Sequence, residues 1–402
     1  MNHKTFLLAV ARCAAVALIS LPALHAAEKP DYKGTAERII TQCAGVKQGD
    51  CVVLRGDIRD IEFLEELGLA VWKQGGEPLQ VVNRERANLR FFEEVPSARD
   101  AIQLPFSLKL AEVETVEVNI SGQEFPGLLS GVAPSRLSAI ERRGLEAFRA
   151  RLGHGVRIVE IGNGLYPTVA TAKRYGISQK QLADLFYGGI NVDYASLQAT
   201  GAALQAVLKA GNQMRITHSN GTDIKLRIES RVVGVSDGVI SAEDIAKGPP
   251  HTQVWLPAGE VYVTPVPGSA DGKLVFDYSP FEEGALTGAT FTFRAGKLVA
   301  NTAAPGESYT RWNAAYADAS SGKDDFAYID LGINPNVKVP AGTKLTTWVP
   351  AGTVSVGLGN NLWAGGTNNG SWSFDISLAG CTVTVDGKVI IENGALRGPK
   401  PL

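Results

Sequence analysis

The sequence predicts an α/β N-terminal half, with a parallel sheet and covering helices, followed by a β-rich α+β C-terminal half. From Thr35 to Val82, short apolar runs alternate with helical segments, as in the βαβ units of parallel sheets. After about residue 213, short strands separated by turn residues replace the helical periodicity. Glycine is abundant, at 44 of 402 residues, which suits a loop-rich second half. We therefore predict domains at 27–212 and 213–402.

The first half begins with a predicted βαβ unit. Ala36–Gln42 is expected to be helical, and Cys51–Leu54 is an apolar run suited to a buried parallel strand. Apolar residues at helical spacing between Ile61 and Val71 predict a covering helix, and Leu79–Val82 is the next strand. No G-x-G-x-x-G motif opens that helix, so the unit gives no indication of a dinucleotide site.

Further elements are expected on both sides of the boundary. Ser178 and Gln181 form a predicted capping box for a helix through Phe186, and Asp386-Gly387 predicts a two-residue β-hairpin. The other predicted elements are strands at Leu110–Ile120 and Val156–Ile161, helices at Ser135–Leu152 and Ala199–Ala210, and strands at Met214–Thr217, Ile224–Ile228, Val261–Val266, Leu274–Phe276 and Thr290–Arg294.

The first 26 residues resemble a cleavable signal peptide. Lys4 supplies a positive start, the stretch from Phe6 to Leu24 is mostly apolar, and Ala26 offers a cleavage site. No stretch is long and apolar enough for a transmembrane helix, so stable membrane insertion is not expected. We predict an exported protein, periplasmic or secreted.

The charge and composition limit the classes of partner that we expect. The formal net charge is -2, and 20% of residues are charged, so neither nucleic acid nor an anionic membrane is expected as a partner. Export permits a disulfide, and Cys43 and Cys51 lie close enough in sequence to pair, although two buried free thiols explain the pattern equally well. Together with Cys381 they do not form a metal-binding set.

Two chemical motifs are weak. The histidines that follow the leader, His154, His218 and His251, have no second His or Cys at ligand spacing, which disfavours an imidazole-based zinc site. The segment around Ser236 reads G-x-S-x-G, but the nucleophile elbow needs a helix directly after it. Here Gly238-Val239-Ile240 is expected to return as a hairpin strand, so a serine hydrolase is disfavoured.

The carboxylates beside apolar strands are more informative. Glu260, Asp330 and Asp375 each adjoin such a strand, where a carboxylate is rarely buried unless it is paired or binds something. Any one of them is explained equally well as a turn or capping residue. The stretch 351–375 reads as strand, loop and strand, so Ser355, Ser373 and Asp375 are able to point towards one place.

Several of these segments together resemble the aminopeptidase T family, which includes aminopeptidase S. The similar segments are LPAGEVYVTPV at 256–266, IDLGINP at 329–335, GTVSVGLG at 352–359, and GGTN through SFD at 365–375. The resemblance implies the family's α/β half and C-terminal metallopeptidase domain, a homodimer, and two divalent metals held by two Glu, two His and one Asp, with a Tyr nearby.

Carried over position by position, the resemblance keeps only part of this metal site. Glu260 and Asp375 keep the family's ligand types, and Asp330 stands where the family has Glu. Three positions are replaced: Ser355 and Ser373 stand for His, and Leu362 stands for Tyr. An all-oxygen set suits Mg²⁺, Mn²⁺ or Ca²⁺ better than Zn²⁺, and the site is also compatible with no metal.

The expected function is a metallo-aminopeptidase homologue with a degenerate metal site. It is expected to bind a peptide-like or small-molecule ligand without hydrolysing it, and Trp348, Trp363 and Trp372 either line that site or pack in the core. The alternative is an active aminopeptidase that uses Glu260, Asp330 and Asp375 in an all-oxygen metal site.

Overall fold

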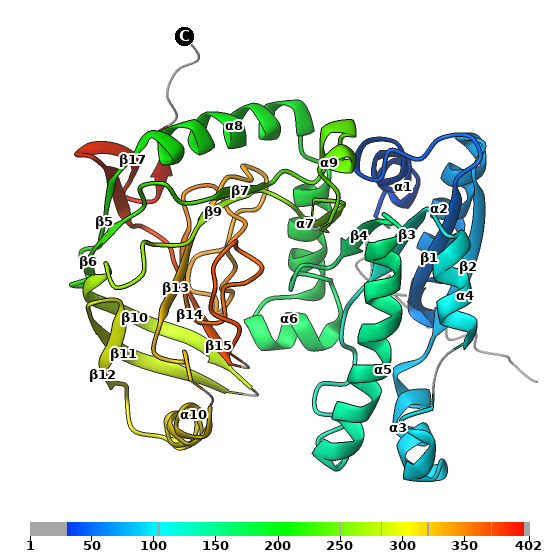
Figure 1. Cartoon of the computed structure of the whole chain (residues 1–402), viewed down its shortest axis with the longest axis horizontal. Coiled ribbons are helices and arrows are strands. Elements are labelled where there is room, and N and C mark those ends of the chain that lie inside the picture. The colour runs from blue at the N-terminus through cyan, green and yellow to red at the C-terminus, as the bar shows by residue number, and fades with distance from the viewer. Residues whose placement is uncertain are drawn as a thin grey trace, which may run out of the picture. The chain divides into compact units, whose positions relative to one another are not determined.

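The computed structural model describes residues 30–102, 105–249, 251–282, 284–319, 321–370 and 372–397. The predicted leader at 1–26 lies outside this part of the chain. Within it, the strands form one parallel and two antiparallel sheets (Figure 1). The α/β half with its parallel sheet and the β-rich half are therefore confirmed as predicted.

Sheet A has five parallel strands in the order β2-β1-β3-β4-β8. These strands are β1 (Cys51–Asp57), β2 (Glu77–Asn83), β3 (Val116–Ile120), β4 (Arg157–Ile161) and β8 (Gln253–Leu256). The last of them lies beyond residue 212, so the chain returns to the first sheet after starting the second half. The domain boundary itself stays a prediction.

Helices cover the first half and connect its strands (Figure 1). The helices of residues 30–249 are α1 (Tyr32–Arg38), continued by the π-helix η1 (Ile39–Cys43), η2 (Ile58–Asp60), α2 (Ile61–Lys73), α3 (Glu85–Glu94), η3 (Ser97–Arg99), α4 (Pro105–Val113), α5 (Pro134–Gly153), α6 (Val169–Tyr175), α7 (Gln179–Ile190), α8 (Tyr194–Ala210) and α9 (Ala242–Lys247). The predicted capping box is present at the start of α7. The Ser178 hydroxyl accepts a hydrogen bond from the Gln181 backbone N–H, and the Gln181 side chain accepts one from the Ser178 backbone N–H.

Sheet B is antiparallel, in the order β12-β11-β10-β6-β5-β16-β17-β18. Its strands are β5 (Gln213–Thr217), β6 (Asp223–Arg227), β10 (Asp271–Phe281), β11 (Gly284–Arg294), β12 (Lys297–Thr302), β16 (Thr382–Val385), β17 (Lys388–Glu392) and β18 (Ala395–Leu396), and α10 (Glu307–Asp318) contacts β11. The predicted hairpin joins β16 to β17, and both Asp386 and Gly387 have the positive φ that this tight turn requires.

Sheet C is the second antiparallel sheet, in the order β15-β14-β13-β9-β7. Its strands are β7 (Val233–Ser236), β9 (Glu260–Val263), β13 (Phe326–Gly332), β14 (Val354–Gly359) and β15 (Ser373–Leu378). All seven residues of the central strand, β13, are buried. The segment from 354 to 378 is strand, loop and strand, as predicted.

Two local predictions are wrong. Leu110–Val113 is the last turn of α4 rather than the start of a strand, and Lys109 pairs with Glu112 across that turn at 2.8 Å. A short apolar run has no periodicity that separates the two structures. After Ser236, Gly238-Val239-Ile240 does not return as a strand: the Asp237 carboxylate accepts a hydrogen bond from the Val239 amide, and α9 begins at Ala242.

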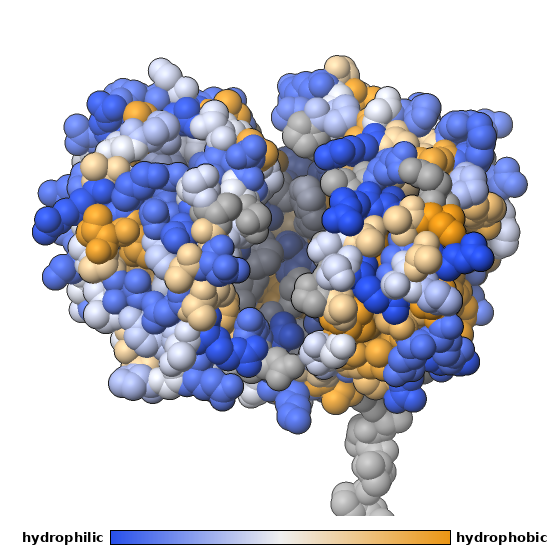
Figure 2. All heavy atoms as spheres, turned by 60° about the horizontal axis from the view of Figure 1, so that its bottom comes forward, coloured by the Kyte–Doolittle hydropathy of each residue, from blue (hydrophilic) through white to orange (hydrophobic). Residues whose placement is uncertain are grey.

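Cys43, Cys51 and Cys381 are all free, which favours the free-thiol alternative over a disulfide. Within the part of the chain that the structure describes, no helix has both the length and the apolar character needed to cross a membrane. Hydrophobic side chains are nevertheless exposed in the first half, where they include Trp72, Phe106 and Val113, and Figure 2 shows such residues gathered among charged ones on one face.

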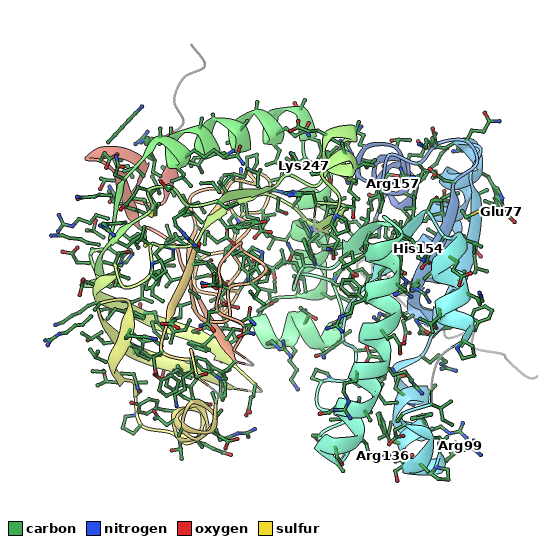
Figure 3. The ribbon with its side chains drawn as sticks, viewed as in Figure 1. Glu77, Arg99, Arg136, His154, Arg157 and Lys247 are labelled. Atoms are coloured by element: carbon green, nitrogen blue, oxygen red, sulfur yellow. The ribbon has the colours of Figure 1, made fainter. Side chains whose placement is uncertain are left out.

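A buried ion pair joins β4 to the loop that follows the first helical segment, and Figure 3 labels its arginine, Arg157. Arg157, at the start of β4, pairs with Asp50 at 2.6 Å and donates a second hydrogen bond to the Ala44 carbonyl at 2.8 Å. Both side chains are more than nine-tenths buried. Burial alone would raise the pKa of Asp50, but the hydrogen bonds from Arg157, the Lys47 amide and Thr115 outweigh it and lower that pKa.

We expect Arg157→Met to lower the free energy of unfolding by about 3 kcal/mol, because it leaves the Asp50 carboxylate buried without its partner. Urea unfolding at pH 7 measures this loss. The control is Arg215→Met, whose partner Asp223 is half exposed, so that the loss should stay below about 1 kcal/mol. Equal losses in the two variants would contradict this account of the buried pair.

Candidate functional site

Sheet C has one apolar and one polar face, because successive side chains of a strand point to opposite sides. The apolar face carries buried residues that include Val261, Ile329, Leu331, Val356 and Ile376. The register places the polar residues on the other face: Ser236 of β7, Glu260 and Tyr262 of β9, Tyr328 and Asp330 of β13, Ser355 of β14, and Ser373, Asp375 and Ser377 of β15. The fold thus brings Glu260, Asp330, Ser355, Ser373 and Asp375 onto one surface.

Glu260 and Asp330 form a carboxyl pair at the centre of this face. Glu260 lies opposite Gly332 and Asp330 lies opposite Tyr262, so the two carboxyls are diagonal neighbours on antiparallel strands. Glu260 is 7% exposed and Asp330 is 3% exposed. Two such groups cannot both ionise easily, so they share a proton.

The pKa values of both carboxyls are raised. Burial is the main cause for Asp330, whose pKa is well above the usual range, and the neighbouring charges of Glu260 and Asp375 raise it further. Burial also raises the pKa of Glu260, while hydrogen bonding with Asp330, Ser236 and Trp348 partly opposes that shift. Burial and the closeness of the two carboxyls therefore both favour protonation of the pair.

Ser236 borders this pair from the neighbouring strand. It lies opposite Glu260 in the ladder between β7 and β9. Its hydroxyl oxygen is buried and makes no hydrogen bond of ordinary geometry, although it lies close enough to Glu260 to lower the pKa of that carboxyl. Since Asp330 Oδ1 is likewise buried without a conventional donor, two polar atoms of different strands have unused hydrogen-bonding capacity in one place.

On the other side of Asp330, hydroxyl groups bond to each other. Ser355 lies opposite Asp330 in the register, and its hydroxyl oxygen is 2.7 Å from that of Ser377 on β15. Ser373 lies at the exposed start of β15, beyond this pair. Ser355 and Ser373, which the resemblance places where the family has His, therefore share a sheet face, but Ser355 is hydrogen-bonded to another serine.

Tyrosines cover the ends of the site. The Tyr328 hydroxyl donates to the Asp375 carboxylate, and its ring lies against Gly357, where a Cβ atom would clash with it. Tyr262 lies against Gly234 in the same way. Desolvation raises the pKa of Asp375 against the effect of that hydrogen bond, although water screens this side chain because it remains exposed.

The three tryptophans separate into different roles. Trp363 is 50% exposed and packs on Tyr262 and Tyr328, with ring centroids 5.0 and 4.8 Å away. Trp348 borders Glu260, as its effect on that pKa shows. Trp372 instead packs against Trp312 and Tyr316 in an aromatic cluster. Leu362 is 52% exposed beside Trp363.

The residues present do not fit the metal centre that the family resemblance implies. Within the described ranges, no three or more His, Cys, Asp or Glu side chains are grouped so that they could hold a metal ion. The polar groups also bond to one another: Asp330 with Glu260, Ser355 with Ser377, and Tyr328 with Asp375. A hydroxyl is a poor substitute for imidazole as a ligand of borderline metals such as zinc.

The sequence matches the thermophilic metalloprotease (M29) family over residues 29–313. This is well over half of the chain. The chain belongs to that family. The matched segment includes Ser236, Glu260 and Tyr262, so the other six residues of the polar face lie beyond it. No curated protein matches the chain.

Two solved structures share the fold. AmpT from Thermus thermophilus has a TM-score of 0.68 at 15% identity, covering 91% of this chain and 98% of that chain. The 2,5-dihydroxypyridine dioxygenase from Pseudomonas putida KT2440 has a TM-score of 0.60 at 14% identity, covering 92% and 97%. At these identities the likeness establishes the M29 fold and not a shared activity.

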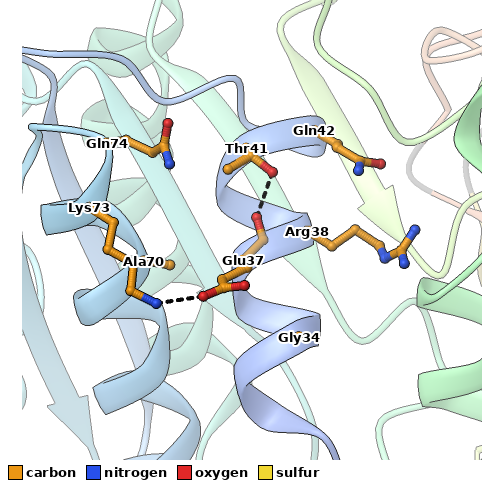
Figure 4. Close-up of a pocket in the computed structure, with 8 residues that line it drawn as sticks. All are labelled: Gly34, Glu37, Arg38, Thr41, Gln42, Ala70, Lys73 and Gln74. Carbon is orange, nitrogen blue, oxygen red and sulfur yellow. Dashed lines mark hydrogen bonds and ion pairs between the residues drawn. The ribbon is translucent and has the colours of Figure 1, made fainter.

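A pocket of about 370 Å³ opens elsewhere, between α1 with η1 and the end of α2 (Figure 4). Its lining residues are Gly34, Glu37, Arg38, Thr41, Gln42, Ala70, Lys73 and Gln74. Lys73 and Glu37 form an ion pair across it. None of the residues predicted from the family resemblance lines this pocket, so we keep the polar face of sheet C as the candidate site.

Sequence reasoning missed four members of the site: Tyr262, Tyr328, Ser377, and Ser236 as a neighbour of Glu260. The two-residue period of Tyr328-Ile329-Asp330 was a usable signal, because it places the tyrosine and the aspartate on one face. Ser236 had no such signal, since its position opposite Glu260 depends on a register between strands that are far apart in sequence.

We predict that stability falls as the pH rises from about 4 towards 8, because the pKa values of Glu260 and Asp330 are higher in the folded than in the unfolded chain. The folded state then binds more protons, and its advantage is lost as the pair is forced to ionise. Asp330→Asn should reduce this slope and add about 1–2 kcal/mol at pH 8. Urea unfolding at pH 5 and 8 measures both effects.

Asp223→Asn is the control for this prediction. The pKa of Asp223 is lowered by the hydrogen bond from Arg215, so removing its charge should cost stability at pH 8 rather than add it. An unchanged slope in Asp330→Asn would show that the pair does not share a proton.

Proposed function

We propose that this M29-family chain binds a peptide-like ligand on the polar face of sheet C and has lost the metal-dependent hydrolysis of its family. The observation that carries the proposal is the Glu260–Asp330 pair. The two carboxyls are buried together and bonded to each other, at strand positions where the family resemblance implies metal ligands. A proton therefore balances one negative charge that a divalent ion would otherwise balance.

The donor chemistry supports this loss of hydrolysis. Metal-assisted hydrolysis needs ions that polarise the carbonyl and generate hydroxide near neutral pH. Holding a borderline metal there would require two serines, Ser355 and Ser373, to replace imidazoles, and would require the carboxyl pair to release its proton. If any divalent ion binds, oxygen donors favour Mg²⁺, Mn²⁺ or Ca²⁺ over Zn²⁺. The fold is no obstacle to a changed function, since chains as different as AmpT and a dioxygenase share it.

We expect the mature protein to show no chelator-sensitive turnover of aminoacyl reporter substrates with Co²⁺, Zn²⁺, Mn²⁺ or Mg²⁺. The triple variant Asp330→Glu, Ser355→His, Ser373→His should bind Zn²⁺ at least tenfold more tightly than the wild type, because it restores the family's donors. Calorimetry and elemental analysis measure binding, and reporter hydrolysis measures turnover. Ser377→His is the matched control on the same face.

Two results would overturn the proposal. Chelator-sensitive turnover by the wild type that Glu260→Gln abolishes would establish an active aminopeptidase with an all-oxygen site. Unchanged zinc affinity in the triple variant would show that the residues do not occupy the positions of the family's ligands.

We further propose that the protein is exported, through cleavage after Ala26, to the periplasm or the medium, and that it forms a homodimer as the family resemblance implies. The basic start and apolar stretch of the leader support export. We expect the N-terminal sequence of the protein expressed in a bacterial host to begin at Ala27, and sedimentation of that protein to give a dimer. An intact Met1 in the cell pellet would contradict export, and a monomer would contradict the assembly.

A further inference from the structure

Among the described residues, no cationic side chain pairs with the carboxyls on the polar face of sheet C. Glu260, Asp330 and Asp375 lie on this face, and among the described residues no ion pair joins any of them to Lys, Arg or His. By contrast, other buried carboxylates, such as Asp50 and Asp100, have arginine partners at 2.6 Å. Buried charges in proteins are normally paired or bind something. The natural complement of this face is therefore a cation.

The unused hydrogen-bonding groups specify what kind of cation fits. The Ser236 hydroxyl oxygen and Asp330 Oδ1 are both buried and without conventional donors, and both adjoin Glu260. Three oxygen acceptors on three different residues match the three N–H donors of an –NH₃⁺ group. Trp348 also hydrogen-bonds to Glu260, and its indole is a donor only.

Aromatic rings border the same acceptors. Tyr262 lies opposite Asp330 in the ladder, Tyr328 precedes Asp330 by two residues on the same face, and Trp363 packs on both tyrosines. Aromatic faces beside carboxylates attract organic ammonium ions through their negative quadrupole.

Trp363 lies in a loop whose base is hydrogen-bonded to its surroundings. Its loop is held at the base by Asn361, which donates to the Ala327 carbonyl at 3.0 Å, and by Asn368, which donates to the Gly322 carbonyl at 2.7 Å and the Gly359 carbonyl at 2.8 Å. Between these anchors, Leu362 and Trp363 are about half exposed. The loop therefore presents a partly exposed Trp363 beside Tyr262 and Tyr328.

We propose that Ser236, Glu260 and Asp330 form a binding site for the ammonium group of an amine or a peptide, with the aromatic rings of Tyr262, Tyr328 and Trp363 beside it. An organic cation thus takes the place that the family resemblance gives to a metal. The inference rests on the proposed loss of metal binding and names the group that this face recognises. The ammonium ion supplies a positive charge that the two neighbouring carboxyls lack.

The test uses the full mature protein, with binding followed by calorimetry and by tryptophan fluorescence. The probes are butylammonium, the dipeptide Ala-Ala, N-acetyl-Ala-Ala and tetramethylammonium. We expect saturable binding of at least one of the first two. The acetylated dipeptide should bind at least tenfold more weakly, as should tetramethylammonium, which is cationic but has no N–H donor. Binding of butylammonium as tightly as Ala-Ala identifies an amine site, and preference for the dipeptide identifies a peptide site.

Variants separate this site from a general effect of charge. Asp330→Asn should weaken binding at least tenfold and Ser236→Ala severalfold, while Asp223→Asn, which removes a carboxylate from β6 of sheet B, should leave it unchanged. Trp363→Phe should keep the calorimetric signal and lose most of the fluorescence change. Thermal melting shows that each variant is folded, and Ser236→Ala keeps the test decisive if Asp330→Asn is not.

The inference is overturned if neither ammonium probe binds, if acetylation leaves affinity unchanged, or if Ser236→Ala and Asp330→Asn both bind like the wild type. Its failure is distinguishable from failure of the proposed function. Absent turnover together with absent ammonium binding overturns this inference alone, whereas chelator-sensitive turnover overturns the proposed function whatever the amines do.

Discussion

The central constraint on this protein is the two-residue period of β13. All seven of its residues are buried, yet alternate positions face different surroundings. Ile329 and Leu331 join the hydrophobic core, which leaves Tyr328 and Asp330 no choice but the opposite face. A shift of one residue in register would place a carboxylate in the core, so the hydrophobic effect that stabilises sheet C also fixes the site. Because β9 and β14 flank this strand, Glu260 and Ser355 are positioned by the same constraint.

Burying two carboxyls side by side costs free energy of folding, and the neighbouring groups show how that cost is reduced. Sharing one proton removes most of the repulsion between Glu260 and Asp330, and the neighbouring Trp348 and Ser236 favour the remaining charge. Arg157 and Asp50 solve the equivalent problem differently, with a full counter-charge and extra hydrogen bonds to backbone carbonyls. The same fold therefore contains one buried acid with its own cation and another pair without one. The Arg157–Asp50 pair is complete within the protein, whereas the Glu260–Asp330 pair is the one that we propose to bind a ligand.

Much of the fold could be predicted from the sequence, because local signals agreed with the final structure. The βαβ unit, the Ser178 capping box and the Asp386-Gly387 hairpin each depend on residues close together in the chain. Failures came where local patterns are ambiguous, as in α4, or where long-range pairing decides, as in β8 joining sheet A. Only part of the candidate site could be predicted from the sequence. Glu260, Asp330 and Asp375 were found through resemblance, whereas Ser236 and Ser377 became visible only through strand register.

The M29 match covers only part of the polar face. The match at 29–313 covers the parallel sheet, most of sheet B and Glu260, and it stops before the strands that supply Asp330, Ser355 and Asp375. The apolar face of β13, β14 and β15 packs into the core, so the fold depends on alternate positions of these strands. The side chains between them point to the polar face and add little to that core packing. A substitution at one of these positions therefore changes the chemistry of the polar face more than it changes the packing that holds the strands together.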